Sequence, residues 1–492
     1  MSPGTPEPST PRASVINLGC RLNQSEGDSL RRYLRNQGYE LEKGVRGQGS
    51  GIRNPNPDPR SPTPVPRPPN PDLVIVNTCC VTKEAERSSL NRIRRAAALR
   101  PKPRVIATGC LAELAPERLS AIPGVDEVLG IEAKNRLTGW PTDSLLTTES
   151  TEEAQRARRF SVSSVSSLCR PWFNSILPLP DRSRAFLKVQ DGCPNSCAFC
   201  VVSTLRTRIW SKPARVVRQE AQDLLDQGFH ELVLVGLNLG TYGADAGTSL
   251  TNLLEELSAL NGTFRIRLSS LEPDTITPDL VNRIQALCRS GILCPHLHTP
   301  LQSGDDRILA AMARHYTAGQ YRDLLQHLTQ AVPDLNIGTD VIVGFPGETE
   351  PTLETTRALL ETLPLGYLHV FSFSSRPGTR AAEMKGALDP KVRKRWVTRL
   401  RSLGSARSRD YRTRFVGAVR PAIPLPRSSI AVTDNYISVQ CGLRNPDCRH
   451  PPLVSVRIDR IDGDRTLGTL LAAAPNGKTP VTGSNVKSSC RA

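Results

Sequence analysis

Aromatic residues are scarce in this chain of 492 residues, and long apolar runs are absent. Phe, Trp and Tyr make up 4% of the sequence, so extended stacking of nucleic-acid bases on aromatic side chains is not predicted. No run of about 18 or more apolar residues occurs, so no membrane-spanning helix is expected. The first residues, MSPGTPEPSTPRAS, contain no apolar stretch and do not predict a secretory signal.

Acidic residues are outnumbered by basic ones, and the formal net charge is +17. Residues 391–420 carry 11 Lys and Arg against one acid, and residues 87–104 carry seven and no acid. Such runs are commonly solvated helix faces. Because these two account for most of the excess charge, they favour contact with a nucleic acid.

The number and spacing of the cysteines do not indicate a disulfide framework. The 13 cysteines are an odd number, and several are spaced as metal ligands are. This usage is typical of a reducing compartment, so a cytoplasmic location is expected.

A triad of cysteines follows a predicted strand near the middle of the chain. Cys193, Cys197 and Cys200 lie in the run DGCPNSCAFCVV, with Phe199 before the last of them. Three thiolates can hold three irons of a cubane iron–sulfur cluster, and the fourth iron can then chelate S-adenosylmethionine (SAM). A structural zinc loop is the alternative, but zinc usually takes four protein ligands and no fourth Cys or His lies in this run. The spacing resembles that of radical SAM enzymes.

Three further cysteines end predicted strands in the first part of the chain. The strand-like runs SVINLGC, DLVIVNTC and RVIATGC end at Cys20, Cys79 and Cys110, and helical segments separate them. This βαβ pattern predicts a parallel sheet, in which these cysteines converge at one edge. Buried structural cysteines are the alternative. Cys80 is adjacent to Cys79, and we assign Cys79 as the ligand because of its place after its strand.

Proline interrupts this first block. Nine of the 18 residues from Asn54 to Pro71 are proline, which predicts an extended, disordered insertion over residues 44–71. We expect an N-terminal domain at residues 13–145, which contains this insertion, and a polar linker at residues 146–178.

Residues 179–410 are predicted to alternate strand and helix six times. The strand candidates are 186–190, 231–240, 264–270, 295–303, 336–345 and 367–374. Repeated βα units predict a parallel barrel or partial barrel, with its chemistry at the carboxyl ends of the strands. His296 and His298 share one side of a strand, where packing or hydrogen bonding is favoured over metal binding.

Glycine-containing turns follow several of these strands. Gly236 and Gly344 let backbone approach a bound cofactor, and the carboxylates of Glu272 and Glu348 can bind ribose hydroxyls or an amino group. Residues 411–474 contain short alternating strands that predict a small β-barrel, and residues 475–492 are expected to be a disordered tail.

Several motifs together resemble the radical SAM methylthiotransferases. They are, in chain order, LGCRLNQSEGD, VNTCCVTKEAERSS, TGCLAE, QDGCPNSCAFCVV, RLSSLEPD, CPHLHTPLQSGDDRIL, GTDVIVGFPGETE and SRPGT. The resemblance spans about residues 14–385. The opening motif and TDNYISVQ look most like the MtaB-type branch, which acts on threonylcarbamoyladenosine in tRNA.

The resemblance implies an α/β protein with three parts: a parallel N-terminal domain, a partial (β/α)6 barrel and a degenerate TRAM domain, a small RNA-binding β-barrel. It implies two 4Fe–4S clusters, an auxiliary one on Cys20, Cys79 and Cys110 and a SAM-cleaving one on Cys193, Cys197 and Cys200. It also implies SAM, a tRNA substrate, a sulfur donor and an electron donor such as flavodoxin or ferredoxin.

The implied reaction adds a methylthio group to carbon 2 of N6-threonylcarbamoyladenosine beside the anticodon. Methylthiolation of isopentenyladenosine in tRNA, or of an aspartate in a ribosomal protein, are the alternative reactions. A non-catalytic iron–sulfur RNA-binding protein is the alternative of another class. No catalytic acid or base is predicted.

Overall fold

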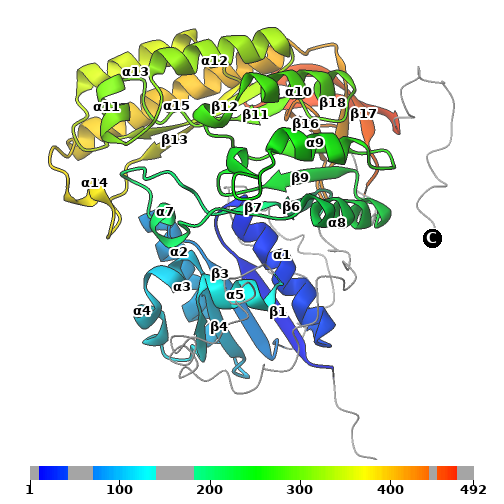
Figure 1. The fold of residues 1–492 in the computed structure, drawn as a ribbon, viewed down its shortest axis with the longest axis vertical. Helices are drawn as coiled ribbons and strands as arrows, with labels where there is room; N and C mark the ends of the chain where they lie inside the picture. The colour runs from blue at the N-terminus through cyan, green and yellow to red at the C-terminus, as the bar shows by residue number, and fades with distance from the viewer. Residues whose placement is uncertain (1–9, 43–69, 140–181, 443–450, 474–492) are drawn as a thin grey trace, which may run out of the picture. The chain divides into compact units, whose positions relative to one another are not determined.

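The computed structural model describes residues 10–42, 70–139, 182–442 and 451–473 (Figure 1). The chain divides into two compact units, residues 1–177 and 178–492. The predicted insertion at 44–71 lies, but for its last two residues, outside the described part, and so do the linker at 146–178 and the tail at 475–492. Within the described ranges, no helix combines the length and the apolar character needed to cross a bilayer.

The first unit is built on a parallel sheet of five strands in the order β2-β1-β3-β4-β5. The strands are β1 (Arg12–Asn17), β2 (Glu40–Leu41), β3 (Leu73–Thr78), β4 (Arg104–Gly109) and β5 (Glu127–Leu129). Every residue of β3 is buried, as expected of a central strand covered on both faces. The predicted βαβ pattern and parallel sheet are therefore confirmed.

Helices connect the strands of this first sheet. They are α1 (Arg21–Asn36), α2 (Lys83–Ala97), α3 (Cys110–Leu114), α4 (Pro116–Ser120) and α5 (Ile131–Leu137). Leu30 and Leu34, one turn apart on α1, pack with Val15 and Ile75 of the sheet. The Thr82 side chain accepts a hydrogen bond from the Ala85 amide and so caps the start of α2.

The second unit contains the six predicted strands of a partial barrel, all parallel. They are β6 (Ala185–Lys188), β9 (Glu231–Val235), β10 (Arg265–Leu268), β11 (His296–His298), β12 (Asn336–Val343) and β13 (Tyr367–Ser372). Two three-stranded sheets, β6-β9-β10 and β11-β12-β13, are joined by the parallel bridges Ile266–Leu293 and Ser270–His298. The strands therefore follow chain order around the barrel, and the predicted partial (β/α)6 barrel is confirmed.

Helices alternate with these strands (Figure 1). The longer ones are α8 (Ala214–Asp226), α9 (Leu250–Ser258), α10 (Pro278–Arg289), α12 (Ala318–Ala331), α13 (Glu350–Thr362) and α15 (Pro390–Thr413). Short helices α7 (Val202–Leu205), α11 (Asp306–Ala311) and α14 (Arg380–Glu383) lie in the loops. Several strands end earlier than predicted: β9 ends at Val235, because the glycine-containing segment after it turns into a short 3-10 helix at Leu239–Thr241.

A closed five-stranded β-barrel follows α15 and confirms the predicted small C-terminal barrel. Its strands are β14 (Val419–Pro424), β15 (Ile430–Thr433), β16 (Ser438–Gln440), β17 (Val454–Asp462) and β18 (Arg465–Ala473). The alternating segments AVTDNYISVQ and PPLVSVRIDRI contain β16 and most of β15 and β17, whereas no such alternation marks β14 and β18. Tyr411 and Phe415, at the end of α15, are part of this barrel's apolar core.

A buried ionic cluster joins the two barrels of the second unit. Glu231 of β9 is fully buried and forms ion pairs with Arg265 and Arg267 of β10. Burial alone would raise the pKa of Glu231, but the two guanidinium groups hold it well below its ordinary value. Arg267 also donates to the backbone oxygens of Thr433 (3.1 Å) and Asp434 (2.9 Å) in the C-terminal barrel.

Removal of one of these arginines should be costly. We expect Arg267→Met to lower the free energy of unfolding by about 3–5 kcal/mol, because Glu231 would keep a buried charge with one partner fewer. Chemical unfolding monitored by circular dichroism measures the change. Arg289→Met, at an exposed position of α10, is the matched control and should be nearly neutral. Equal stability of the two variants would contradict the role given to the buried pair.

Candidate functional site

The three cysteines of the first unit lie at one edge of its sheet. Cys79 follows β3 directly, Cys110 follows β4 directly as the first residue of α3, and β3 lies between β1 and β4. Cys20 lies three residues beyond the end of β1, so its place after its strand differs from that of the other two. Burial, and then the neighbouring thiols of Cys20 and Cys110, raise the pKa of Cys79 to about 12. The structure thus brings together the three residues that sequence reasoning selected.

Glycine shapes the approach to two of these cysteines. Gly19 has φ +89°, and a Cβ there would lie 2.6 Å from the Cys79 Sγ. Gly109 has φ +93°, and a Cβ there would lie 2.5 Å from the Thr78 carbonyl oxygen. Only glycine combines this backbone conformation with so little space. The Gly–Cys pairs of LGC and TGC therefore bring backbone and thiols close together at this edge.

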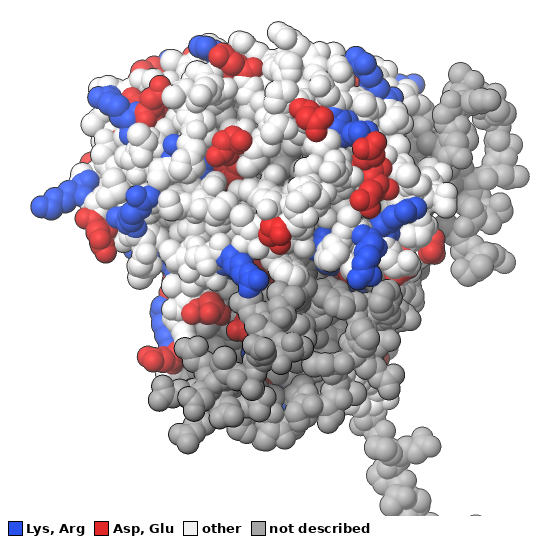
Figure 2. All heavy atoms as spheres, in the orientation of Figure 1, with Lys and Arg blue, Asp and Glu red and all other residues white. Residues whose placement is uncertain are grey.

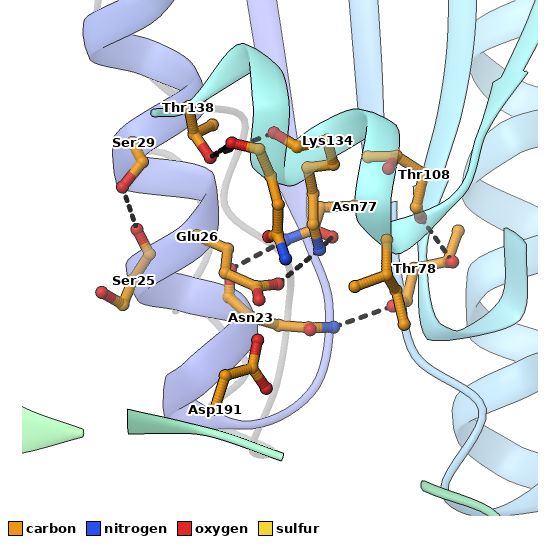
Figure 3. A network of polar contacts seen from close by, with 12 residues as sticks. Asn23, Ser25, Glu26, Ser29, Asn77, Thr78, Thr108, Lys134, Thr138 and Asp191 are labelled. Carbon is orange, nitrogen blue, oxygen red and sulfur yellow. Dashed lines mark hydrogen bonds and ion pairs between the residues drawn. The ribbon is translucent and has the colours of Figure 1, made fainter. Parts of the chain in front are cut away.

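A buried polar network holds the same edge (Figure 3). The ammonium group of Lys134, on α5, is fully buried and bonds to the carboxylate of Glu26 on α1. The Asn77 side chain at the end of β3 donates to the Asn23 carbonyl oxygen at 2.8 Å, and the Asn23 side chain donates to the Thr78 carbonyl oxygen at 2.8 Å. These bonds connect α1, β3 and α5 at the residues next to the cysteine loops, and they restrict how those loops can move.

The second cysteine triad lies on a loop after β6 and the short strand β7 (Gln190–Asp191). Strand β7 pairs antiparallel with β8 (Trp210–Ser211), a small ribbon that the sequence did not predict. The amide of Cys193 donates to the Arg206 carbonyl oxygen at 3.0 Å. This hydrogen bond connects the start of the loop, at Cys193, to its end, at Arg206. All three thiols are partly exposed. Burial, and then nearby Glu272 and the other two thiols, raise the pKa of Cys193 to about 11.

Arg314 is a residue at this site that sequence reasoning missed. Its Nη1 donates to the Cys197 Sγ at 3.2 Å, and its Nη2 is ion-paired with Glu272. The guanidinium group is nearly buried and also lies over the ring of Tyr316. Arg314 is 117 residues from Cys197 along the chain, and no motif marks it. A positive charge beside a thiolate stabilises the deprotonated form that binds iron.

The five residues predicted to contact SAM lie around this loop, and some of them also pack against neighbouring residues. Phe199 packs against the apolar group that includes Phe345, the neighbour of Gly344. A Cβ on Gly236 would lie 2.8 Å from the Gln190 Oε1, so glycine is needed there for packing as well. Glu272 affects the pKa of both Cys193 and Cys197, which places its carboxylate close to the thiols.

Glu348 closes the turn that follows β12. Its Oε2 accepts hydrogen bonds from the amides of Gly344 (2.5 Å) and Phe345 (3.1 Å). Its Oε1 is buried with no hydrogen-bond partner among the described residues. An unmatched buried carboxylate oxygen is costly, and a bound donor such as an amino or hydroxyl group would relieve that cost.

The basic runs are partly neutralised within the chain. On α15, Arg395 pairs with Glu350 at 2.5 Å and Arg399 with Glu354 at 3.1 Å. Figure 2 accordingly shows basic side chains interspersed with acidic ones on the face that it displays. On α2, Arg94 and Arg95 are exposed and form no ion pair within the described residues. Within residues 87–104, Lys102 pairs with Asp126 and Arg104 with Glu127, so the charge of this run that stays available to a polyanion lies on α2.

Comparison with known proteins places the chain in a family. The model of the Radical SAM superfamily matches residues 187–360, and that of Uncharacterized protein family UPF0004 matches residues 60–130. The Threonylcarbamoyladenosine tRNA methylthiotransferase MtaB of Thermotoga maritima is 33% identical over 83% of this chain and 85% of its own length. Its namesake from Bacillus subtilis is 33% identical over 86% of this chain and 88% of its own.

The chain belongs to the radical SAM methylthiotransferases. Another relative, the tRNA-2-methylthio-N(6)-dimethylallyladenosine synthase of Cereibacter sphaeroides, is 34% identical over 90% of this chain and 95% of its own. Among solved structures, the radical SAM methyltransferase TsrM of Kitasatospora setae has 15% identity and a TM-score of 0.48, covering 75% of this chain and 77% of that one. Membership in this family implies a 4Fe–4S cluster and SAM, and the three thiols beside Arg314 are a suitable donor set for such a cluster.

The buried carboxylate of Glu348 generates a prediction about pH. Burial raises its pKa from 4.5 to about 7, against the two amide bonds that lower it. The folded state therefore holds this proton more tightly than the unfolded state. The contribution of the protonated carboxyl group to the free energy of unfolding is fully present below pH 4.5 and is lost as the pH rises toward about 7. Without SAM, the unfolding free energy of the unaltered protein should fall by about 3 kcal/mol at most between pH 5 and 8, because of Glu348. We expect this fall to be absent in Glu348→Gln.

The matched control for this experiment is Glu383→Gln, an exposed carboxylate of α14. The control should keep the pH dependence of the unaltered protein. A Glu348→Gln variant with that same pH dependence would show that the raised pKa of Glu348 has no effect on stability.

Proposed function

We propose that this methylthiotransferase adds a methylthio group to carbon 2 of N6-threonylcarbamoyladenosine beside the anticodon of tRNA. The observation that carries the proposal is the presence of two cysteine triads, each at the carboxyl ends of parallel strands in its own unit. A single triad would suffice to cleave SAM, so the second one points to a reaction that also needs a source of sulfur. The relatives named above act on tRNA according to their names.

Cys193, Cys197 and Cys200 would hold the SAM-cleaving 4Fe–4S cluster. Such a cluster, when bound and reduced, supplies the electron that converts SAM into methionine and a 5′-deoxyadenosyl radical. Arg314 would hold the Cys197 thiolate in place, and Asn238, whose amide lies 3.9 Å from the Cys193 Sγ, would stabilise a second one. Radical chemistry suits this substrate because carbon 2 of adenine is not activated toward nucleophiles.

Phe199, Gly236, Glu272, Gly344 and Glu348 would form the SAM pocket beside this loop. The unmatched Oε1 of Glu348 offers an acceptor for the amino group or a ribose hydroxyl of SAM. Glu272 offers a second acceptor, and its ion pair with Arg314 would couple SAM binding to the thiolate of Cys197. No residue is assigned as a general acid or base.

Cys20, Cys79 and Cys110 would hold the auxiliary 4Fe–4S cluster, which would supply the sulfur of the methylthio group. Another SAM would supply its methyl group. The raised pKa of Cys79 means that this thiol would lose its proton when iron binds. Gly19 and Gly109 would let the backbone pass close to Cys79 and Thr78 with no side chain in between. The buried network of Glu26 and Lys134 would keep the three cysteine loops in register.

The partners follow from this reaction. An electron donor such as flavodoxin or ferredoxin would reduce the SAM-cleaving cluster, and a sulfur donor would restore the auxiliary one. We assign residues 13–145 to the auxiliary-cluster domain, 179–410 to the radical SAM domain and 411–474 to an RNA-binding domain of the TRAM type. The exposed arginines of α2 would add sequence-independent attraction for phosphates.

The substrate is tested by mass spectrometry of nucleosides in total tRNA from a deletion strain. We expect 2-methylthio-N6-threonylcarbamoyladenosine to disappear and N6-threonylcarbamoyladenosine to accumulate. Restoring the gene should reverse both changes, whereas a copy carrying Cys197→Ala should not. Loss of 2-methylthio-isopentenyladenosine instead would assign the enzyme to the other tRNA substrate, and unchanged tRNA would refute both.

The two-cluster arrangement is tested by counting iron after anaerobic reconstitution. Two 4Fe–4S clusters correspond to about eight irons per chain. Replacing Cys20, Cys79 and Cys110 together by Ala should lower the count to about four and leave cleavage of SAM to 5′-deoxyadenosine intact.

The matched control is Cys80→Ala, which removes the buried cysteine beside Cys79 and should keep all the iron. An unchanged iron count in the triple variant would refute the auxiliary site. A loss of iron in Cys80→Ala alone would show that the wrong member of the pair had been assigned as ligand.

A further inference from the structure

Three potential metal ligands from neighbouring strands meet inside the partial barrel, and none of them belongs to either cysteine triad. They are His298 at the end of β11, Asp340 in β12 and His369 in β13. Asp340 lies directly opposite His369 in the parallel register, and His298 lies opposite Gly338, two residues away. One ligand atom from each residue lies within 4.8 Å of the other two. We call these residues the His–Asp–His triad.

The triad lies on the concave side of the sheet. Leu368, the neighbour of His369, lies against α15 on the outer side, where a Cβ on Gly404 would be 3.0 Å from the Leu368 Cβ. Successive residues of a strand point to opposite faces, so His369 points inward. The ring of Tyr436 contacts Arg267, His296 and Tyr367, which come from three different strands. His296 and Tyr367 lie two residues before His298 and His369, and therefore on the same face of their strands.

The distances within the triad suit coordination. The Oδ1 of Asp340 lies 3.0 Å from the Nε2 of His298 and 3.1 Å from the Nδ1 of His369. Ligand atoms about 2.0–2.2 Å from one zinc ion are separated by roughly 3.3 Å in tetrahedral geometry. The atoms that share hydrogen bonds here are thus close to where ligand atoms around one ion would lie.

A second layer of contacts orients the first histidine. The Nδ1 of His298 lies 3.1 Å from the Tyr367 hydroxyl oxygen, and that hydroxyl also lies 2.9 Å from the Nε2 of His296. Histidines that bind metals commonly use the second ring nitrogen in this way, which sets the tautomer and leaves the first nitrogen for the ion. The expected hydrogen bonding of His296 and His298 is present, and for His298 it leaves Nε2 directed at Asp340.

The site is open on one side. His298 is buried, whereas the side chain of His369 is 54% exposed and that of Asp340 is 24% exposed. A bound ion would therefore keep at least one position for water or for an oxygen of another molecule. Two imidazoles and one carboxylate favour borderline divalent ions, while the six thiols described above favour iron–sulfur clusters.

We propose that His298, Asp340 and His369 form a third metal site, which binds one divalent transition-metal ion such as Zn²⁺ with an open coordination position. The site uses nitrogen and oxygen ligands from β11, β12 and β13. The proposal of this metal site does not depend on which adenosine the enzyme modifies, since none of the ligands belongs to either cysteine triad.

The test uses the full chain with both iron–sulfur sites reconstituted, so that the six thiols of the cysteine triads do not compete for the added metal. Equilibrium dialysis against Zn²⁺, followed by elemental analysis of zinc and iron, should give one zinc per chain beyond the iron. His369→Ala and Asp340→Ala should each weaken zinc binding at least about 100-fold, because each removes a ligand. His327→Ala, an exposed histidine of α12, is the matched control and should bind zinc like the unaltered chain.

Two measurements keep the outcome clear. The iron content should be the same in all variants, and X-ray absorption at the zinc edge should show nitrogen and oxygen ligands without sulfur. Because His369 is half-exposed, its variant should fold even if the Asp340 variant does not. Absence of zinc binding in the reconstituted chain, full zinc binding by His369→Ala, or a zinc ion ligated by sulfur would each overturn the proposal.

Discussion

The common direction of the strands is the constraint on which the candidate chemistry of this protein depends. In the sheet of the first unit and in the partial barrel of the second, parallel strands connected by helices bring the carboxyl ends of the strands to one edge. Cysteines that are 59 and 31 residues apart in the chain thereby become neighbours in the first unit. The same geometry brings the loop of Cys193, the turn at Gly236 and the turn at Gly344 to one end of the partial barrel.

Buried charges join separate elements in both units. Glu231 with its two arginines joins the partial barrel to the C-terminal barrel, and Glu26 with Lys134 joins three elements beside the first cysteine triad. The cations Arg267 and Lys134 make further hydrogen bonds, to the Thr433 carbonyl oxygen and to the Asn77 side chain, and such bonds help a buried pair to be tolerated. A chain of polar and ring contacts runs from Arg267 over Tyr436 to His296, and through the Tyr367 hydroxyl and His298 to Asp340.

Local pattern was sufficient for much of the fold. The alternation of apolar strands with amphipathic helices predicted the parallel sheet and the six barrel strands, and the alternation within short strands predicted the small β-barrel. The periodicities of strands and of helices can both be recognised from residues that are close in the chain. It was less accurate at strand ends, where the loop after β9 contains apolar residues that do not belong to the strand. It also missed β2, β5, β7, β8, β14 and β18, which are short or lack a clear apolar alternation and depend on partners elsewhere in the chain.

The sequence by itself determined the family, the parallel architecture and the two sets of cysteines, because motif spacing and periodicity need no long-range information. The tertiary structure decided which charged groups are neutralised, as with Arg395 and Arg399 on α15, and which distant residues reach the thiols, as with Arg314 and Cys197. It also brought His298, Asp340 and His369 together. These contacts join residues on separate elements, and their distances depend on strand register and side-chain packing, which no local pattern specifies.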